Sequence, residues 1–308
     1  MKKLPLLATA ATLACLTASL HAATVYRINS GAGSGQYWNQ AANWNDSGNP
    51  AASGKDYVVA NGQNLRASGE FAGDSLTFTN GGSLGIFNAV TVDNLSMTGS
   101  GNNYIVHNAL TISLSNKSGG TSSFDISSDS LTFNTGAVSN RTLTINQAIS
   151  GTAKLISRVG YKFNSTKTDN TNKTVFASAS NTWSGDIELQ NGTFDFTHGI
   201  SAQTLTLNGD ASEIGGLSEG YSTARFFIND GESYTFTSIT TGTHSLDLGT
   251  YSVDDLNSWL SGNGESDKAL FEAVGGASGL IIVAVPEPSS AALLGLGGLA
   301  LILRRRRK

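Results

Sequence analysis

A short alternating phrase recurs along the middle of the chain: an apolar residue, a threonine and a second apolar residue. It stands at Leu76-Thr77-Phe78, Val90-Thr91-Val92, Leu110-Thr111-Ile112, Leu131-Thr132-Phe133, Leu143-Thr144-Ile145 and Leu205-Thr206-Leu207. Successive side chains of a strand point to opposite faces, so this alternation is typical of strands with one buried face. Because long helical patterns are absent between residues 24 and 245, we predict an all-β body.

Clusters of turn-forming residues separate these phrases. They are Asn80–Gly82, Asn116–Gly120, Asn191-Gly192 and Asn208-Gly209. Asn and Gly accept positive φ, so each cluster can turn the chain sharply. Many short strands with such turns fit a right-handed parallel β-helix, or solenoid, or else a β-sandwich. We favour the solenoid for residues 23–250, and at roughly 20 residues per coil it would have about eleven coils.

The pattern changes after residue 250, where a short amphipathic helix is predicted. Ser252 is a candidate N-cap, and Gly262 can end the helix. Apolar residues fall on one face of it at Val253, Leu256, Trp259 and Leu260. A last buried strand is expected in Gly279–Val285. Residues 251–285 would therefore form a C-terminal cap of the body.

The first 22 residues have the three parts of a secretory signal peptide. Lys2 and Lys3 form a basic start, Leu4–Leu20 is uncharged and mostly apolar, and Ala22 is a small residue suited to cleavage. Cleavage there would remove Cys15, the single cysteine of the chain. The alternative, a lipoprotein acylated at Cys15, fits poorly because the residues before this cysteine are an imperfect acylation signal.

The last 23 residues also have three parts in a fixed order. Pro286-Glu287-Pro288 is a rigid element, and Ser289–Leu303 is uncharged and mostly apolar. A basic block ends the chain at Arg304, Arg305, Arg306, Arg307 and Lys308. As a helix the apolar part spans about 22 Å, less than the roughly 30 Å hydrocarbon core of a bilayer. We expect a short transmembrane helix in which the arginines stop translocation on the cytoplasmic side.

This tail resembles the PEP-CTERM sorting signal of Gram-negative bacteria. The resemblance implies that a membrane enzyme, exosortase, recognises Pro286, Glu287 and Pro288 and processes the tail during export. The implied partners are this enzyme and the secretion translocon. The implied route passes through an inner-membrane intermediate to the cell surface or the extracellular matrix.

Two stretches of the body resemble secreted bacterial β-helix proteins. Asn181–Phe196 is similar to the autotransporter-associated β-strand repeat, which its residues match at Trp183, Gly185, Ile187, Leu189, Gly192, Phe194 and Phe196. Tyr37–Pro50 resembles the opening segment of such proteins. There we expect Trp38 and Trp44 to cover the open first coil. The alternative is that exposed tryptophans stack on sugar rings.

The charge of the chain indicates which kinds of molecule the body can bind. Charged residues make up only 14% of the chain and the net charge is −4. Without the two ends, residues 23–285 hold 12 Lys and Arg against 22 Asp and Glu. Because this body is acidic, neither nucleic acid nor anionic lipid is expected as its main partner. A lone cysteine provides neither a disulfide framework nor a cysteine-based zinc site within one chain.

The chain shows little catalytic chemistry. Its histidines, His21, His107, His198 and His244, are isolated in the sequence, and no recognised catalytic motif is present. Adjacent Asp254 and Asp255 could form a carboxylate pair, but their place at a helix start favours capping. Asp186, Glu188 and Asp195 could bind Ca²⁺, but solvated coil faces are the better interpretation.

We therefore expect no catalytic residue, cofactor or metal site. The predicted function is that of an exported, non-catalytic protein with a structural or adhesive role in the cell envelope or matrix, where exopolysaccharide is a candidate partner. The alternative is a secreted polysaccharide lyase or glycoside hydrolase on a β-helix.

Overall fold

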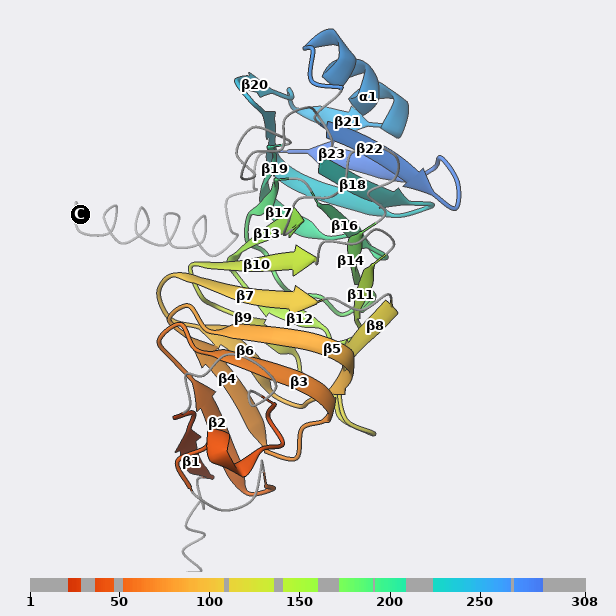
Figure 1. The fold of residues 1–308 in the computed structure, drawn as a ribbon. Helices are drawn as coiled ribbons and strands as arrows, with labels where there is room; N and C mark the ends of the chain where they lie inside the picture. Colours follow the sequence, from red (N-terminus) through yellow and green to blue (C-terminus); the bar gives the residue numbers. More distant parts are fainter. Residues whose placement is uncertain are drawn as a thin grey trace, which may run out of the picture.

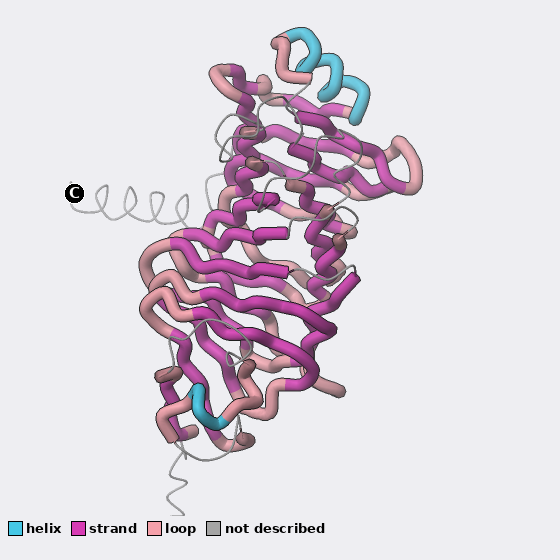
Figure 2. Tube along the Cα trace, viewed as in Figure 1, coloured by secondary structure: helices cyan, strands magenta, loops and turns pink. Residues whose placement is uncertain are grey.

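The computed structural model describes residues 22–28, 37–46, 52–107, 111–135, 141–159, 172–190, 192–208, 224–266 and 269–284. Within these ranges the protein is built from β-sheets and one α-helix, α1 (Val253–Gly262) (Figures 1 and 2). The prediction of an all-β body with a short C-terminal helix is confirmed for this part of the chain.

One sheet has six strands, all paired in parallel with their neighbours. In order they are β1 (Ala23–Tyr26), β2 (Lys55–Val59), β4 (Ser75–Thr79), β6 (Leu95–Thr98), β9 (Phe124–Ile126) and β12 (Ile149–Gly151). From β2 to β12, each strand pairs with the next after the chain has passed through one or two strands of the other sheet.

The second sheet has seventeen strands and contains two parallel rows. The first row is β3 (Asn64–Glu70), β5 (Ser83–Thr91), β7 (Asn102–His107), β10 (Ser130–Thr135), β13 (Lys154–Val159), β15 (Ile187–Leu189), β17 (Ser201–Leu207) and β19 (Ser233–Thr241). The second row is β8 (Thr111–Ser115), β11 (Thr142–Ile145), β14 (Lys173–Phe176), β16 (Thr193–Phe196), β18 (Ala224–Asn229) and β22 (Ala269–Val274). The remaining strands are β20 (His244–Ser245), β21 (Gly249–Tyr251) and β23 (Leu280–Val283).

Nearly all strand pairs of the described residues are parallel; β19–β20 and β21–β23 are the antiparallel ones. Parallel neighbours are not what a sandwich of antiparallel strands would give. The register shows that paired strands are not separated by a fixed number of residues. Asp56 pairs with Ser75 after 19 residues, whereas Ala224 pairs with Ala269 after 45. Strand β23 continues the first row in parallel from β19, so this row has nine strands in the described residues, compared with the expected eleven or so coils.

The predicted alternation decides which side chains are buried. In β4, Leu76 and Phe78 are buried, and Thr77 on the other face shares a 2.9 Å hydrogen bond with Ser96 of β6. The other strand phrases lie in β5, β8, β10, β11 and β17, except that Val92 follows the end of β5 and Leu110 is outside the described residues. The polar face is therefore linked from strand to strand by side-chain hydrogen bonds.

Two Asn-Gly corners stack 19 residues apart. Asn61 and Asn80 have φ of 57° and 54°, and the glycines after them also have positive φ. The Gly62 N–H donates to the Asn80 carbonyl oxygen at 3.2 Å, which joins one corner to the next. The turn at Asn80 was predicted; Asn191 and Gly209 are outside the described residues.

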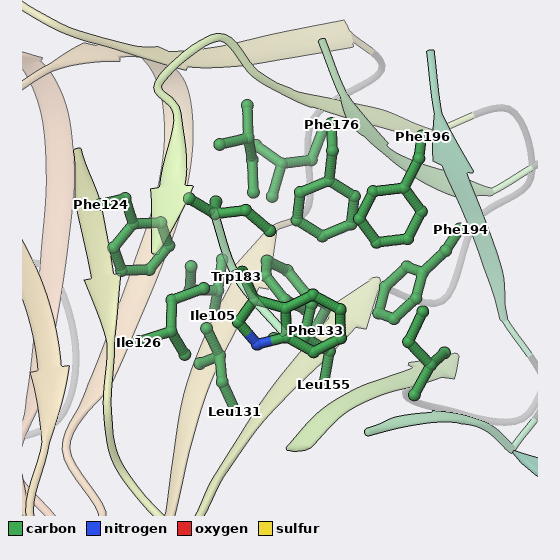
Figure 3. Packing of buried hydrophobic residues seen from close by; sticks show 14 of the residues in the cluster. Ile105, Phe124, Ile126, Leu131, Phe133, Leu155, Phe176, Trp183, Phe194 and Phe196 are labelled. Carbon is green, nitrogen blue, oxygen red and sulfur yellow. The ribbon is translucent and has the colours of Figure 1, made fainter. Parts of the chain in front are cut away.

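Aromatic rings fill the middle of the core (Figure 3). The rings of Phe176 and Phe196 stack with centroids 4.4 Å apart, and Phe133 and Phe194 meet edge to face at 5.6 Å. Trp183 is buried beside them, and its indole N–H donates to the Ala153 carbonyl oxygen at 2.9 Å. These contacts explain why the segment Asn181–Phe196 is rich in aromatic residues.

The first strands are closed by a cluster of four aromatic residues. Trp38 and Trp44 are each only 1% exposed. Trp44 meets Tyr57 at 4.7 Å, and Trp38 meets Phe71 at 5.1 Å between ring centroids. The predicted burial of both tryptophans beside the first strands is confirmed, and the solenoid coil that they would cover stays a prediction. The alternative of exposed tryptophans stacking on sugars is wrong, because neither ring reaches solvent.

At the other end of the molecule α1 covers the last strands, as predicted (Figure 1). Ser252 caps the helix and forms a reciprocal capping box with Asp255. Val253, Leu256 and Leu260 are buried, and Trp259 packs partly buried against the core. The predicted apolar face therefore points to the body.

An asparagine covers a strand edge at each end of the molecule. The Asn257 side chain in α1 donates to the Phe271 carbonyl oxygen at 2.8 Å and accepts from the Phe271 N–H at 3.0 Å. At the first strand, Asn45 exchanges two 3.0 Å hydrogen bonds with the backbone of Tyr26, one through its side chain and one through its own N–H. Both edges thus have backbone groups that are satisfied within the chain.

Candidate functional site: the strand before the sorting tail

Strand β23 ends directly before the predicted sorting tail and is paired on both sides. Its residues Leu280 to Val283 pair in parallel with β19, and Val283 lies opposite Gly249 of the antiparallel β21. One residue later, the Ala284 N–H donates to the Phe236 carbonyl oxygen at 2.9 Å. The backbone is therefore fixed to the body up to Ala284. This confirms the last strand predicted in Gly279–Val285, of which Val285 is outside the described residues.

An exposed leucine lies beside this exit point. Leu248 is 62% exposed and directly precedes Gly249, which pairs with Val283. On the other side of β23, Thr237 follows Phe236, and its hydroxyl donates to the Gln203 carbonyl oxygen at 2.6 Å. Strands β21 and β23 lie at the α1 end of the molecule, far from β1 and β2 (Figure 1).

The residues predicted to carry sorting lie beyond this strand. Pro286, Glu287, Pro288, Arg304, Arg305, Arg306 and Arg307 are outside the described residues, as are residues 1–21 of the predicted leader. Ala22, the predicted cleavage position, is described; it is partly buried and directly precedes β1. In the described part of the chain, no helix is long and apolar enough to cross a membrane.

Residues 284–308 match the model of the PEP-CTERM protein-sorting motif. The chain therefore carries a signal for export and for processing at the membrane by an exosortase. The match begins at Ala284, the residue that is still hydrogen-bonded to β19. Neither the curated proteins nor the solved structures contain a match to the chain.

The adjacent carboxylates at the helix start serve the fold. Asp255 accepts hydrogen bonds from the Ser252 hydroxyl at 2.6 Å and from the Ser252 N–H at 3.0 Å. These bonds stabilise the ionised form, so the pKa of Asp255 is lowered from its usual value. Asp254 is exposed in the same first turn. The capping role predicted for this pair is confirmed for Asp255.

The three carboxylates considered for calcium bind other groups of the protein. Glu188 pairs with Lys154 at 3.1 Å, and Asp195 pairs with Lys173 at 2.9 Å. Asp186 accepts a hydrogen bond from the Thr204 N–H at 3.1 Å. Nowhere in the described ranges do three or more His, Cys, Asp or Glu side chains gather in a way that could hold a metal ion.

Glu188 and Asp195 are both partly or fully buried and are held by different groups of the protein. Burial of Glu188 opposes its ionisation, but hydrogen bonds from Gln190 and Lys154 outweigh this effect and lower its pKa. Asp195 is only 4% exposed. The interpretation of a solvated coil face is wrong for Asp195, because Lys173 and the Asn229 amide, at 3.0 Å, occupy its oxygens.

The histidines remain apart from one another. His198 lies 3.4 Å from the Glu232 carboxylate, and His244 belongs to β20. His107 is fully buried on the inner face of β7, and neither ring nitrogen has a hydrogen-bond partner. His21 is outside the described residues. The burial of His107 was missed, although its place in the alternation of Asn102–His107 could have indicated it.

Proposed function

We propose that this protein is an exported, exosortase-sorted component of the cell envelope or extracellular matrix, with a structural or adhesive role and no catalytic activity. The observation that carries the proposal is the sorting motif at residues 284–308. We further propose that the body is a parallel β-solenoid and that its final location is the cell surface or the matrix.

Three features of the body support the solenoid. The strands of each row pair in parallel with strands of the next turn. Corners such as Asn61-Gly62 and Asn80-Gly81 repeat the same backbone conformation. The segment similar to the autotransporter-associated repeat contributes Ile187, Leu189 and Phe194 to the shared core. A stack of this kind gives a long scaffold with an extended surface, which suits a structural role.

The proposed absence of catalysis is supported by the state of the conspicuous carboxylates. Asp195, Glu188 and Asp255 are each held by a hydrogen bond or ion pair within the fold. A screen with neutral and acidic glycans tests this. We expect no turnover; turnover that is lost in Asp195→Asn would overturn the proposal in favour of a polysaccharide lyase or hydrolase.

Processing of the tail is tested by intact-mass measurement of the protein from its native host. The mature form should lack the basic block that ends at Lys308. Replacing Pro286, Glu287 and Pro288 together by alanine should leave an uncleaved form in the membrane fraction. A surface-located mature protein that still ends at Lys308 would show that the tail is a simple anchor and that exosortase does not process it.

A further inference from the structure

The tether between the body and the apolar segment of the tail is short. Ala284 is hydrogen-bonded to Phe236 in the body, and the apolar segment of the tail begins at Ser289. The chain between them, residues 285–288, spans at most about 14 Å even when fully extended. A body whose last strand is paired on both sides therefore has little freedom to move away from a bilayer that holds the tail.

The side of the body at this exit point is suited to lipid contact. The register that pairs Gly249 with Val283 brings Leu248 level with Ala284 when it is continued by one residue. Leu248 is 62% exposed, although leucine is normally buried. The other large apolar side chains that are clearly exposed among the described residues, Tyr26 and Ile28, lie at or just after β1, at the opposite end of the molecule.

We propose that, while the tail is in the membrane, the exit face formed by Thr237, Leu248 and Ala284 lies against the outer lipid surface of that membrane. Leu248 then enters the boundary between headgroups and acyl chains, where an apolar side chain is favoured. This inference rests on the proposed function, because it requires an inserted tail. Beyond that function, it states which face of the body lies toward the membrane and names Leu248 as the residue that contacts lipid.

The tether also explains the choice of lipid over another partner. With only residues 285–288 between Ala284 and the apolar segment, the surface nearest to the exit face is the bilayer itself. An exposed leucine alone would not define a partner. Its place next to the point where the chain leaves β23, a strand paired on both sides, does so.

The test uses the exported protein from a host without a sorting enzyme, so that the leader is removed and the tail is kept. With Cys15 gone, Leu248→Cys introduces a single thiol for a nitroxide label. Tyr26→Cys, at a 50% exposed site at the other end, is the matched control. Both proteins are bound to vesicles of phosphatidylethanolamine and phosphatidylcholine, lipids without net charge, and flotation confirms binding.

Collision with lipid-soluble oxygen and with a water-soluble nickel chelate then reports the surroundings of each label. We expect the label at residue 248 to shift toward oxygen on binding, and the label at residue 26 to stay accessible to nickel. A ten-residue Gly-Ser linker between Val285 and Pro286, with a reach of about 17 Å, should abolish the shift while flotation is retained.

Equal nickel accessibility of both labels on floating vesicles would overturn the proposal. So would a chain that does not float, or a shift that survives the linker. A shift seen only when a sorting enzyme is added would indicate the enzyme as the partner of this face. Failure of sorting itself is recognised separately, by the intact mass of the protein from its native host.

Discussion

His107 carries an ionisable ring into a part of the core where a charge is costly. Burial, followed by repulsion from Arg141, lowers its pKa from 6.5 to about 4. Between these values the unfolded chain binds a proton that the folded chain does not bind. This histidine therefore leaves stability unchanged above pH 6.5 and reduces it progressively as the pH falls toward 4.

We expect His107→Leu to remove this part of the acid sensitivity. Between pH 6.5 and 4, the free energy of unfolding of the wild type should fall by on the order of 3 kcal/mol through this group alone. Urea unfolding of residues 23–285 across this range measures the slope. His198→Leu, at a half-exposed histidine, is the control. This variant should keep most of the wild-type slope of the free energy of unfolding against pH. Equal slopes for His107→Leu and the wild type would contradict this assignment.

Gly185 tests how closely consecutive turns of the chain approach one another. A Cβ at this position would collide with the carbonyl oxygens of Thr152 and Ala153. We expect Gly185→Ala to destabilise the protein by about 1–3 kcal/mol, because the backbone must move apart. Gly262→Ala is the matched control, since a Cβ there meets nothing within 4 Å. Denaturant midpoints that shift equally in both variants would exclude this explanation.

Among the elements, α1 protects the sheet through one side chain. Asn257→Ala removes both hydrogen bonds to the Phe271 backbone at the edge of β22. We expect a loss of about 1–3 kcal/mol in the free energy of unfolding and concentration-dependent self-association through the uncovered edge. Asn257→Asp, which keeps only the acceptor, should be intermediate. Thermal unfolding and light scattering at several concentrations measure the two effects; a monomeric, fully stable Asn257→Ala would contradict them.

The strands and the helix could be predicted because their causes are local. Alternation in Leu76–Phe78 fixes the buried face, and Ser252 with Asp255 fixes the helix start. The number of turns could not be predicted, because the corners accept insertions while the register of β18 and β22 stays parallel. The roles of Asn257 and Asp195 also depend on partners that are distant in the sequence. Short-range patterns do not contain such pairings.

For the whole molecule, the parallel register predicts an elongated body. Small-angle scattering of residues 23–285 should give the pair-distance distribution of a rod, with a long tail beyond the main peak. Far-UV circular dichroism should be dominated by β structure with a small helical contribution from α1. A symmetrical distance distribution typical of a globular domain would contradict the proposed solenoid.

The double pairing of β23 also determines how the body responds to force. A pull on the tail acts along β23, nearly perpendicular to the hydrogen bonds that join it to β19 and β21. The hydrogen bonds to β19 and to β21 are then loaded in shear at the same time. They must break together and cannot open one after another. While the tail is attached, tension between the body and the membrane is carried by a strand that is hydrogen-bonded to a neighbour on each side.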